Sequence, residues 1–179
     1  MDLDGSNQVQ LTFSDTSWSS GCSPDGRWIV FTSESSDQPH GFGLMKLALE
    51  GGDPEPLNTG GASLLPSVSP DGKWIVFRYR GKEERDLTAV MPSDGGKIRR
   101  IFDISAEARW SPDGKDLTYI RTIDGVSNIW AQPFEGGEPR QITRFTEGLI
   151  FNFAWSKEGD LALSRGAIES DVVLIENFR

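Results

Sequence analysis

Short apolar runs and polar turns alternate along the whole chain. Two of the runs, Trp-Ile-Val-Phe at residues 28–31 and again at 74–77, are continuously apolar and rich in β-branched and aromatic side chains. Such runs are typical of strands whose two faces are both buried. No window of the sequence shows the apolar period of a helix over three turns, so the pattern predicts an all-β protein.

The turns repeat with the strands. The tetrapeptide Ser-Pro-Asp-Gly begins at Ser23, Ser69 and Ser111, and Ser156 begins a degenerate fourth copy, Ser-Lys-Glu-Gly. A second marker, an acidic residue followed by Gly-Gly, occurs at 50–52, 94–96 and 135–137. Proline, aspartate and glycine favour tight turns, and Gly-Gly suits a hairpin. Two markers in the same phase indicate four structural repeats.

Each repeat has room for four strands, which we label a to d in chain order. The fold class expected is an all-β propeller with four four-stranded blades, at 13–58, 59–102, 103–144 and 145–179. The expected strands are 18–22, 28–33, 43–49 and 55–58; 64–68, 74–79, 86–91 and 98–102; 106–110, 116–121, 128–132 and 140–144; and 151–155, 160–164 and 171–175.

The fourth repeat lacks its last strand, and the amino terminus can supply it. Residues 3–12 align without gaps on 49–58 and on 134–143, so residues 1–12 are expected to be the closing strand of the last blade. We expect residues 8–12 to pair with 171–175, which would remove an open sheet edge. A four-blade ring, a two-chain eight-blade ring and a part of a larger propeller all fit this pattern, and the two-chain ring is favoured because its strands close.

The repeat resembles that of TolB-type β-propellers. The best copies are Trp-Ser-Pro-Asp-Gly-Lys at 110–115 and Gly-Gly-Glu-Pro-Arg-Gln-Ile-Thr at 136–143. The segments 161–166 and 170–175 are similar to the end of the propeller sensor regions attached to bacterial membrane-bound serine/threonine kinases and winged-helix regulators. This resemblance implies either the carboxyl-terminal sensor module of such a protein or a stand-alone relative, and it favours a periplasmic or other extracytoplasmic location.

Charge and composition limit the classes of partner and cofactor that the chain is expected to bind. The chain has 27 acidic and 18 basic residues, a net charge of −9, which disfavours binding to nucleic acid. Its apolar runs are too short for membrane insertion. The single histidine, His40, excludes a metal site built on paired histidines, and the sequence has no glycine-rich phosphate cradle before a helix. We therefore expect no cofactor and no metal.

No catalytic constellation is evident, and the chain is not expected to be an enzyme. Asp25, Asp71 and Asp113 occupy the same turn in three repeats, so their role is expected to be structural. Cys22 is expected to be a buried strand residue, because its repeat counterparts are Val68, Trp110 and Trp155. Four tryptophans at equivalent strand positions, Trp28, Trp74, Trp110 and Trp155, are expected to pack between blades.

Function is therefore expected on loops. The d–a and b–c connections, which vary in sequence, should open on one face of a propeller, and the short a–b and c–d turns on the other. We expect a protein or peptide partner to bind the variable face, with a homodimer as the second association. The alternatives are the propeller of a prolyl-oligopeptidase-type peptidase without its hydrolase domain, and an enzyme with its site in the channel. The candidate partner-binding residues are Asp15, His40, Arg80, Glu84, Arg85, Asp103, Asp124, Glu147 and Arg165, and the candidate channel residues are Glu107, Arg109 and Asn152, the first two as an ion pair.

Overall fold

The computed structural model of the protein describes residues 4–13, 16–34, 41–57, 59–81 and 84–169. Within these ranges the regular structure consists of β-strands, and no α-helix is present. The prediction of an all-β protein is therefore confirmed.

The strands form sheets in chain order, which we call blades 1 to 4. Blade 1 contains β1 (Ser17–Cys22), β2 (Trp28–Glu34), β3 (Phe42–Ala48) and β4 (Glu55–Leu57). Blade 2 contains β5 (Ala62–Val68), β6 (Trp74–Arg80), β7 (Asp86–Pro92) and β8 (Arg100–Phe102). Blade 3 contains β9 (Ala108–Trp110), β10 (Asp116–Ile123), β11 (Val126–Pro133) and β12 (Arg140–Gln141). Blade 4 contains β13 (Leu149–Trp155) and β14 (Leu161–Gly166), and its expected third strand, 171–175, lies outside the described residues.

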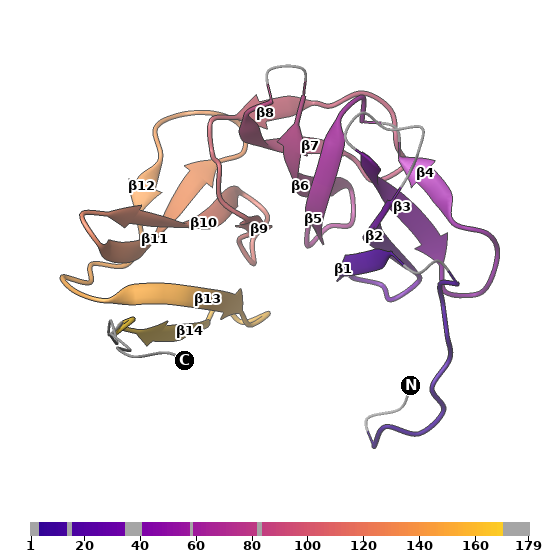
Figure 1. Ribbon diagram of the computed structural model, residues 1–179, viewed down its shortest axis with the longest axis horizontal. Helices are drawn as coiled ribbons and strands as arrows, with labels where there is room; N and C mark the ends of the chain where they lie inside the picture. The colour runs from indigo at the N-terminus through magenta and orange to yellow at the C-terminus, as the bar shows by residue number, and fades with distance from the viewer. Residues whose placement is uncertain (1–3, 14–15, 35–40, 58, 82–83, 170–179) are drawn as a thin grey trace, which may run out of the picture.

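The sheets are antiparallel, and each strand pairs with its neighbour in sequence. Figure 1 shows the blades side by side along an open arc, with β1, β5, β9 and β13 on its inner side. The arc does not close into a ring within the described part of the chain. The fold is thus a run of propeller blades, and ring closure is not confirmed.

The Ser-Pro-Asp-Gly turns have the same geometry in three blades. In blade 3 the Ser111 hydroxyl donates to Asp113 Oδ1 over 2.7 Å, and the same oxygen accepts the Lys115 amide at 3.1 Å. The amide of Gly114 donates to the Ser111 carbonyl at 2.9 Å, and Gly114 has φ +70°. Gly26 and Gly72 have φ +69° and +73°, so the expected left-handed conformation is present in all three copies.

The core lies between blades. Because strand side chains alternate between faces, each central strand can contact both neighbouring blades. On β6, Ile75 and Phe77 pack toward blade 1 and Val76 packs toward blade 3. The three clusters are Val30, Leu44, Leu57, Ile75, Phe77, Ala89 and Met91; Val76, Val90, Ile104, Ala108, Trp110, Leu117, Tyr119 and Phe134; and Ile129, Ile150 and Phe153. Trp28, Trp74, Trp110 and Trp155 all join these clusters, as predicted.

Cys22 contradicts the sequence prediction, because it is exposed. Its counterparts Val68, Trp110 and Trp155 each contact the cluster shared with the preceding blade. Blade 1 is the first blade of the arc, so the described residues provide no preceding blade to cover this position (Figure 1). The repeat correctly placed Cys22 on a strand, but it could not show that no other blade covers this strand within the described residues.

Residues 4–13 extend away from the blades as an arm (Figure 1). They form no strand, and Val9 and Phe13 are 71% and 83% exposed. The predicted partner of residues 8–12, the segment 171–175, is outside the described residues, so this pairing stays a prediction.

Candidate partner-binding face

The b–c loops and d–a segments lie together. Arg85, in the loop after β6, forms an ion pair with Asp103, in the segment after β8. The amide of Ser127, at the start of β11, donates to the carbonyl of Gly148 at 3.0 Å, and Arg165 Nη2 donates to the carbonyl of Glu147 at 2.6 Å. These contacts join both kinds of connection on one side of the blades, which we call the loop face. The opposite side, made of the Ser-Pro-Asp-Gly and Gly-Gly turns, we call the turn face.

The carboxylates of the turn face are used within their own turns. The hydrogen bond from the Ser23 hydroxyl holds the pKa of Asp25 below its ordinary value, and the bond from the Ser111 hydroxyl does the same for Asp113. For Asp71, burial raises the pKa, but hydrogen bonds from Ser69 and Lys73 outweigh it and the net shift is downward. The repeated geometry supports the structural role expected for these residues.

Blade 2 carries a cluster of charges at the edge of the loop face. Arg78 and Arg80 both bind the carboxylate of Asp86, with Arg80 Nη2 at 2.6 Å from Asp86 Oδ1. The hydrogen bond from Arg78 is the main cause that lowers the pKa of Asp86. Arg78 Nε is buried without a hydrogen-bond partner among the described residues. This network holds the start of the b–c loop. Arg80, which was expected to contact a partner, forms part of the network.

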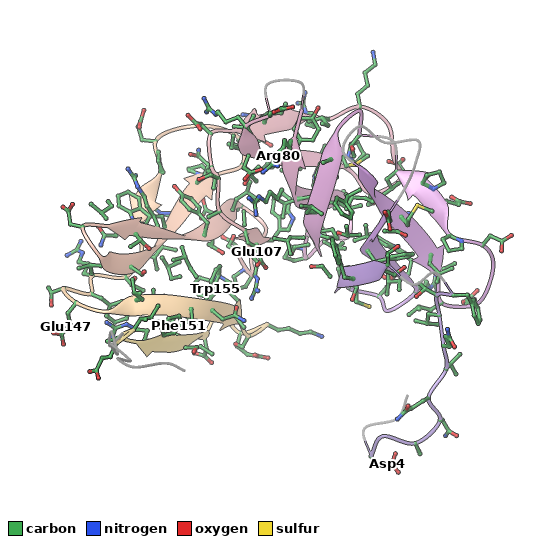
Figure 2. The ribbon with its side chains drawn as sticks, in the orientation of Figure 1. Asp4, Arg80, Glu107, Glu147, Phe151 and Trp155 are labelled. Carbon is green, nitrogen blue, oxygen red and sulfur yellow. The ribbon has the colours of Figure 1, made fainter. Side chains whose placement is uncertain are left out.

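The remaining loop candidates are dispersed along the face. Glu84, Asp124 and Glu147 are exposed, and the first two adopt left-handed backbone conformations with φ +52° and +49°. Arg165 lies with its guanidinium carbon 3.6 Å from the centroid of the Phe145 ring. Figure 2 shows Glu147 at the far end of the arc from blade 1. Asp15 and His40 lie outside the described residues.

The candidate channel residues form contacts within the protein. Arg109 Nη2 lies 2.9 Å from Glu107 Oε1, so the expected ion pair is present. Arg109 also donates to the carbonyl of Phe153, and its guanidinium carbon lies 5.2 Å from the ring centroid of that residue. Asn152 Oδ1 accepts the amide of Phe153 at 2.8 Å. Arg109 therefore bridges blades 3 and 4 on the inner side of the arc.

Sequence reasoning missed a pocket between blades 2 and 3. It is lined by residues 102–106 from blade 2 and the following segment, and by Tyr119, Arg121, Thr122 and Gln132 from blade 3. The signal was a departure from the repeat: Tyr119 stands where the other blades have Phe31 and Phe77, and Arg121 stands where they have Ser33 and Tyr79.

The described residues also bear on metal binding and on membrane spans. No group of three or more histidine, cysteine, aspartate or glutamate side chains that could hold a metal ion occurs among the described residues. None of those residues belongs to a helix long and apolar enough to cross a bilayer.

Known structures share the fold. No family model matches the chain. A TolB-type protein from Agrobacterium tumefaciens superposes with a TM-score of 0.62 and 25% identity, over 82% of this chain and 56% of that one. TolB from Acinetobacter baumannii gives a TM-score of 0.70 and 23% identity, over 88% of this chain and 39% of that one.

Peptidases provide a second group of similar proteins. The chain is 36% identical over 59 residues to dipeptidyl aminopeptidase BIII of Pseudoxanthomonas mexicana, which is 32% of this chain and 9% of that protein. A prolyl endopeptidase structure gives a TM-score of 0.60 at 15% identity, over 84% of this chain and 26% of that one. The chain thus spans 9% of the dipeptidyl aminopeptidase and between 26% and 56% of the three solved structures.

Proposed function

Because the chain folds as a TolB-like β-propeller, we propose that it is a non-catalytic module that binds a protein or peptide through its loop face. The observation that carries this proposal is the contrast between the two faces. The turn face repeats one hydrogen-bonded turn in each complete blade, whereas the loop face carries connections that differ in sequence and charge. Variable loops on a rigid scaffold are the usual location of a recognition surface.

Selection from a displayed peptide library tests this proposal. Enriched peptides should bind the purified chain, and Arg85→Glu should weaken them about tenfold or more by reversing a charge on the loop face. Arg27→Glu is the matched control, because Arg27 is exposed and lies in the first Ser-Pro-Asp-Gly turn region. Equal losses in both variants, or the absence of any enriched peptide, would contradict a loop-face site.

The similarity to peptidases favours a second candidate function. A segment 36% identical to part of a dipeptidyl aminopeptidase and the fold match to a prolyl endopeptidase support a propeller that accompanies a hydrolase domain. The two functions differ in what the complete coding sequence contains. A serine hydrolase domain encoded in the same reading frame would support the peptidase function, and a kinase or winged-helix domain would support the sensor function predicted from residues 161–166 and 170–175.

For the assembled ring we propose that two copies complete each other. The outward side of blade 4 exposes small residues, Ala154 and Ala162, together with Phe151, which is 51% exposed. At the other end of the arc Cys22 is exposed at a position that contacts a neighbouring blade in every later repeat. Packing the first blade of one copy on the last blade of another would cover both surfaces.

A further inference from the structure

The pocket between blades 2 and 3 has a donor-rich wall. Its volume is about 480 Å³, and it lies where the segment after β8 passes the middle of β10. This volume lies within the range of small-ligand pockets and is large enough for one or two amino-acid side chains. Residues 103–106 and Thr122 bring the pocket to the loop face, so a peptide bound there could reach it.

Tyr119 provides a neutral hydrogen-bond donor in this wall. Its side chain is only 6% exposed, and burial raises the pKa of its hydroxyl, so the hydroxyl keeps its proton at neutral pH. The side chain lines the pocket, so its hydroxyl can donate to a group bound there. Phe31 and Phe77 fill the same position in blades 1 and 2, so packing alone does not require the oxygen.

Arg121 provides the charge. Its guanidinium carbon lies 4.8 Å from the centroid of the Trp130 ring, which holds the group by a cation–π contact. Arg121 has no carboxylate partner in the described part of the chain, whereas Arg80, Arg85 and Arg109 are each paired. A guanidinium that rests on a ring keeps its planar set of donors free for an anion.

We propose that this pocket binds a carboxylate of the peptide partner through the Arg121 guanidinium and the Tyr119 hydroxyl. The inference deepens the proposed function and rests on it. A carboxylate accepts two parallel hydrogen bonds from arginine and has lone pairs left for a phenolic donor. Asp103 also lines the pocket, but its charge is matched by Arg85, so it does not cancel the attraction of Arg121. The carboxylate comes from an acidic side chain or from the carboxyl terminus of the peptide.

Nuclear magnetic resonance of the isotope-labelled chain tests the proposal with three probes. These are a terminally blocked Gly-Glu-Gly, a blocked Gly-Gln-Gly of the same shape, and Gly-Gln-Gly with a free carboxyl terminus. We expect at least one carboxylate probe to shift the signals of Arg121 and Tyr119, and the blocked Gly-Gln-Gly to leave them unchanged. The two carboxylate probes show whether the side chain or the terminus is recognised.

Variants assign the effect to the two donors. Arg121→Gln should weaken carboxylate binding about tenfold, because it removes a charge-assisted pair of hydrogen bonds, and Tyr119→Phe should weaken it several-fold. The second variant places in blade 3 the residue that blades 1 and 2 already have, so the fold should tolerate it. Arg27→Gln makes the same change of charge on the turn face and should have no effect.

Two results would overturn the proposal. One is equal binding of the blocked Gly-Gln-Gly and the carboxylate probes at this pocket, and the other is unchanged carboxylate affinity in Arg121→Gln. A library peptide that loses affinity in Arg85→Glu but keeps it in Arg121→Gln would contradict the pocket alone and leave the loop-face function standing.

Discussion

The serine hydroxyl of each Ser-Pro-Asp-Gly turn donates to the aspartate two residues later. The same carboxylate accepts a hydrogen bond from the amide of the residue just before the next strand. In blade 1 these bonds run from Ser23 to Asp25 at 2.6 Å and from the Arg27 amide to Asp25 at 3.1 Å. Blades 2 and 3 repeat both bonds. At the residue scale, the repeated serine and aspartate residues therefore stabilise tight turns, and their side chains are used within those turns.

The turn carboxylates should make stability depend on acid. The pKa of Asp113 lies below its ordinary value of 3.8, mainly because of the hydrogen bond from Ser111. A lowered folded-state pKa contributes stability that is fully present above the unfolded value and is lost as pH falls through the folded value. The stability lost in Asp113→Asn, measured by urea unfolding, should therefore be largest near neutral pH and should shrink below about pH 4.

The control for this experiment is Asp124→Asn, which makes the same chemical change in an exposed loop. It should give no comparable pH-dependent difference. A difference between wild type and Asp113→Asn that stays constant from neutral pH into the acid range would show that the turn hydrogen bond does not depend on the charge of Asp113.

The loss of unfolding free energy caused by three substitutions should depend on where each residue lies in the repeat. Trp110→Ala should cost roughly 3–5 kcal/mol, because the indole is 5% exposed and packs on Phe134 at 5.2 Å between ring centroids. Gly114→Val should cost more than about 1 kcal/mol, because φ is +70° there. Glu84→Ala, in an exposed loop, should change the free energy of unfolding by less than about 0.5 kcal/mol. Urea unfolding measures all three, and a harmless Trp110→Ala beside a costly Glu84→Ala would contradict the assigned core.

At the scale of elements, the sequence predicted every strand in the described ranges, because each strand begins or ends at one of the two repeated turn markers. The outermost strands are shorter than predicted: β4, β8 and β12 have 3, 3 and 2 residues. Each of them lies at the outer edge of its sheet and pairs with one neighbour. The apolar residues of the repeat do not indicate at which residue the pairing of an outer strand with its neighbour ends.

The candidate site was less accessible to sequence reasoning. Repeat phase placed Arg80, Arg85 and Asp103 on the loop face, but it could not show that the two arginines form ion pairs with Asp86 and Asp103. The pocket at Tyr119 and Arg121 could not be predicted from the sequence, because it depends on the distance between blades 2 and 3, which tertiary packing sets. The burial of Cys22 was predicted wrongly for the same reason, since it depends on a neighbouring blade.

In the proposed two-chain ring, the amino-terminal arm is the closing strand of the last blade. Val9, Leu11 and Phe13 alternate with polar residues and are all exposed, which is the pattern of a strand with one apolar face and no partner. Deleting residues 1–12 should therefore abolish association of two copies or cause aggregation through an uncovered strand edge. Light scattering of the truncated chain checks this. A soluble truncated chain with unchanged mass and stability would show that the arm is not the closing strand.

At the scale of the whole molecule, the repeat predicts which residues meet across a completed joint. Trp155 Nε1 donates to Thr118 Oγ1 at 3.0 Å across the joint between blades 3 and 4. Cys22 is the repeat counterpart of Trp155, and Ala162 is the counterpart of Thr118. In a two-chain ring, Ala162→Cys should therefore be joined efficiently to Cys22 of another copy by a short bis-maleimide. Ile123→Cys, on the loop face, is the control and should give little cross-linked dimer.

Completion of the ring by a second copy would cover the two ends of the arc and give the arm a partner. The solution mass of the purified full chain, measured by light scattering behind size exclusion, tests it most directly. For a two-chain ring we expect a mass twice the 19.7 kDa of one chain. A stable species of 19.7 kDa that stays soluble and folded across the concentration range would contradict it.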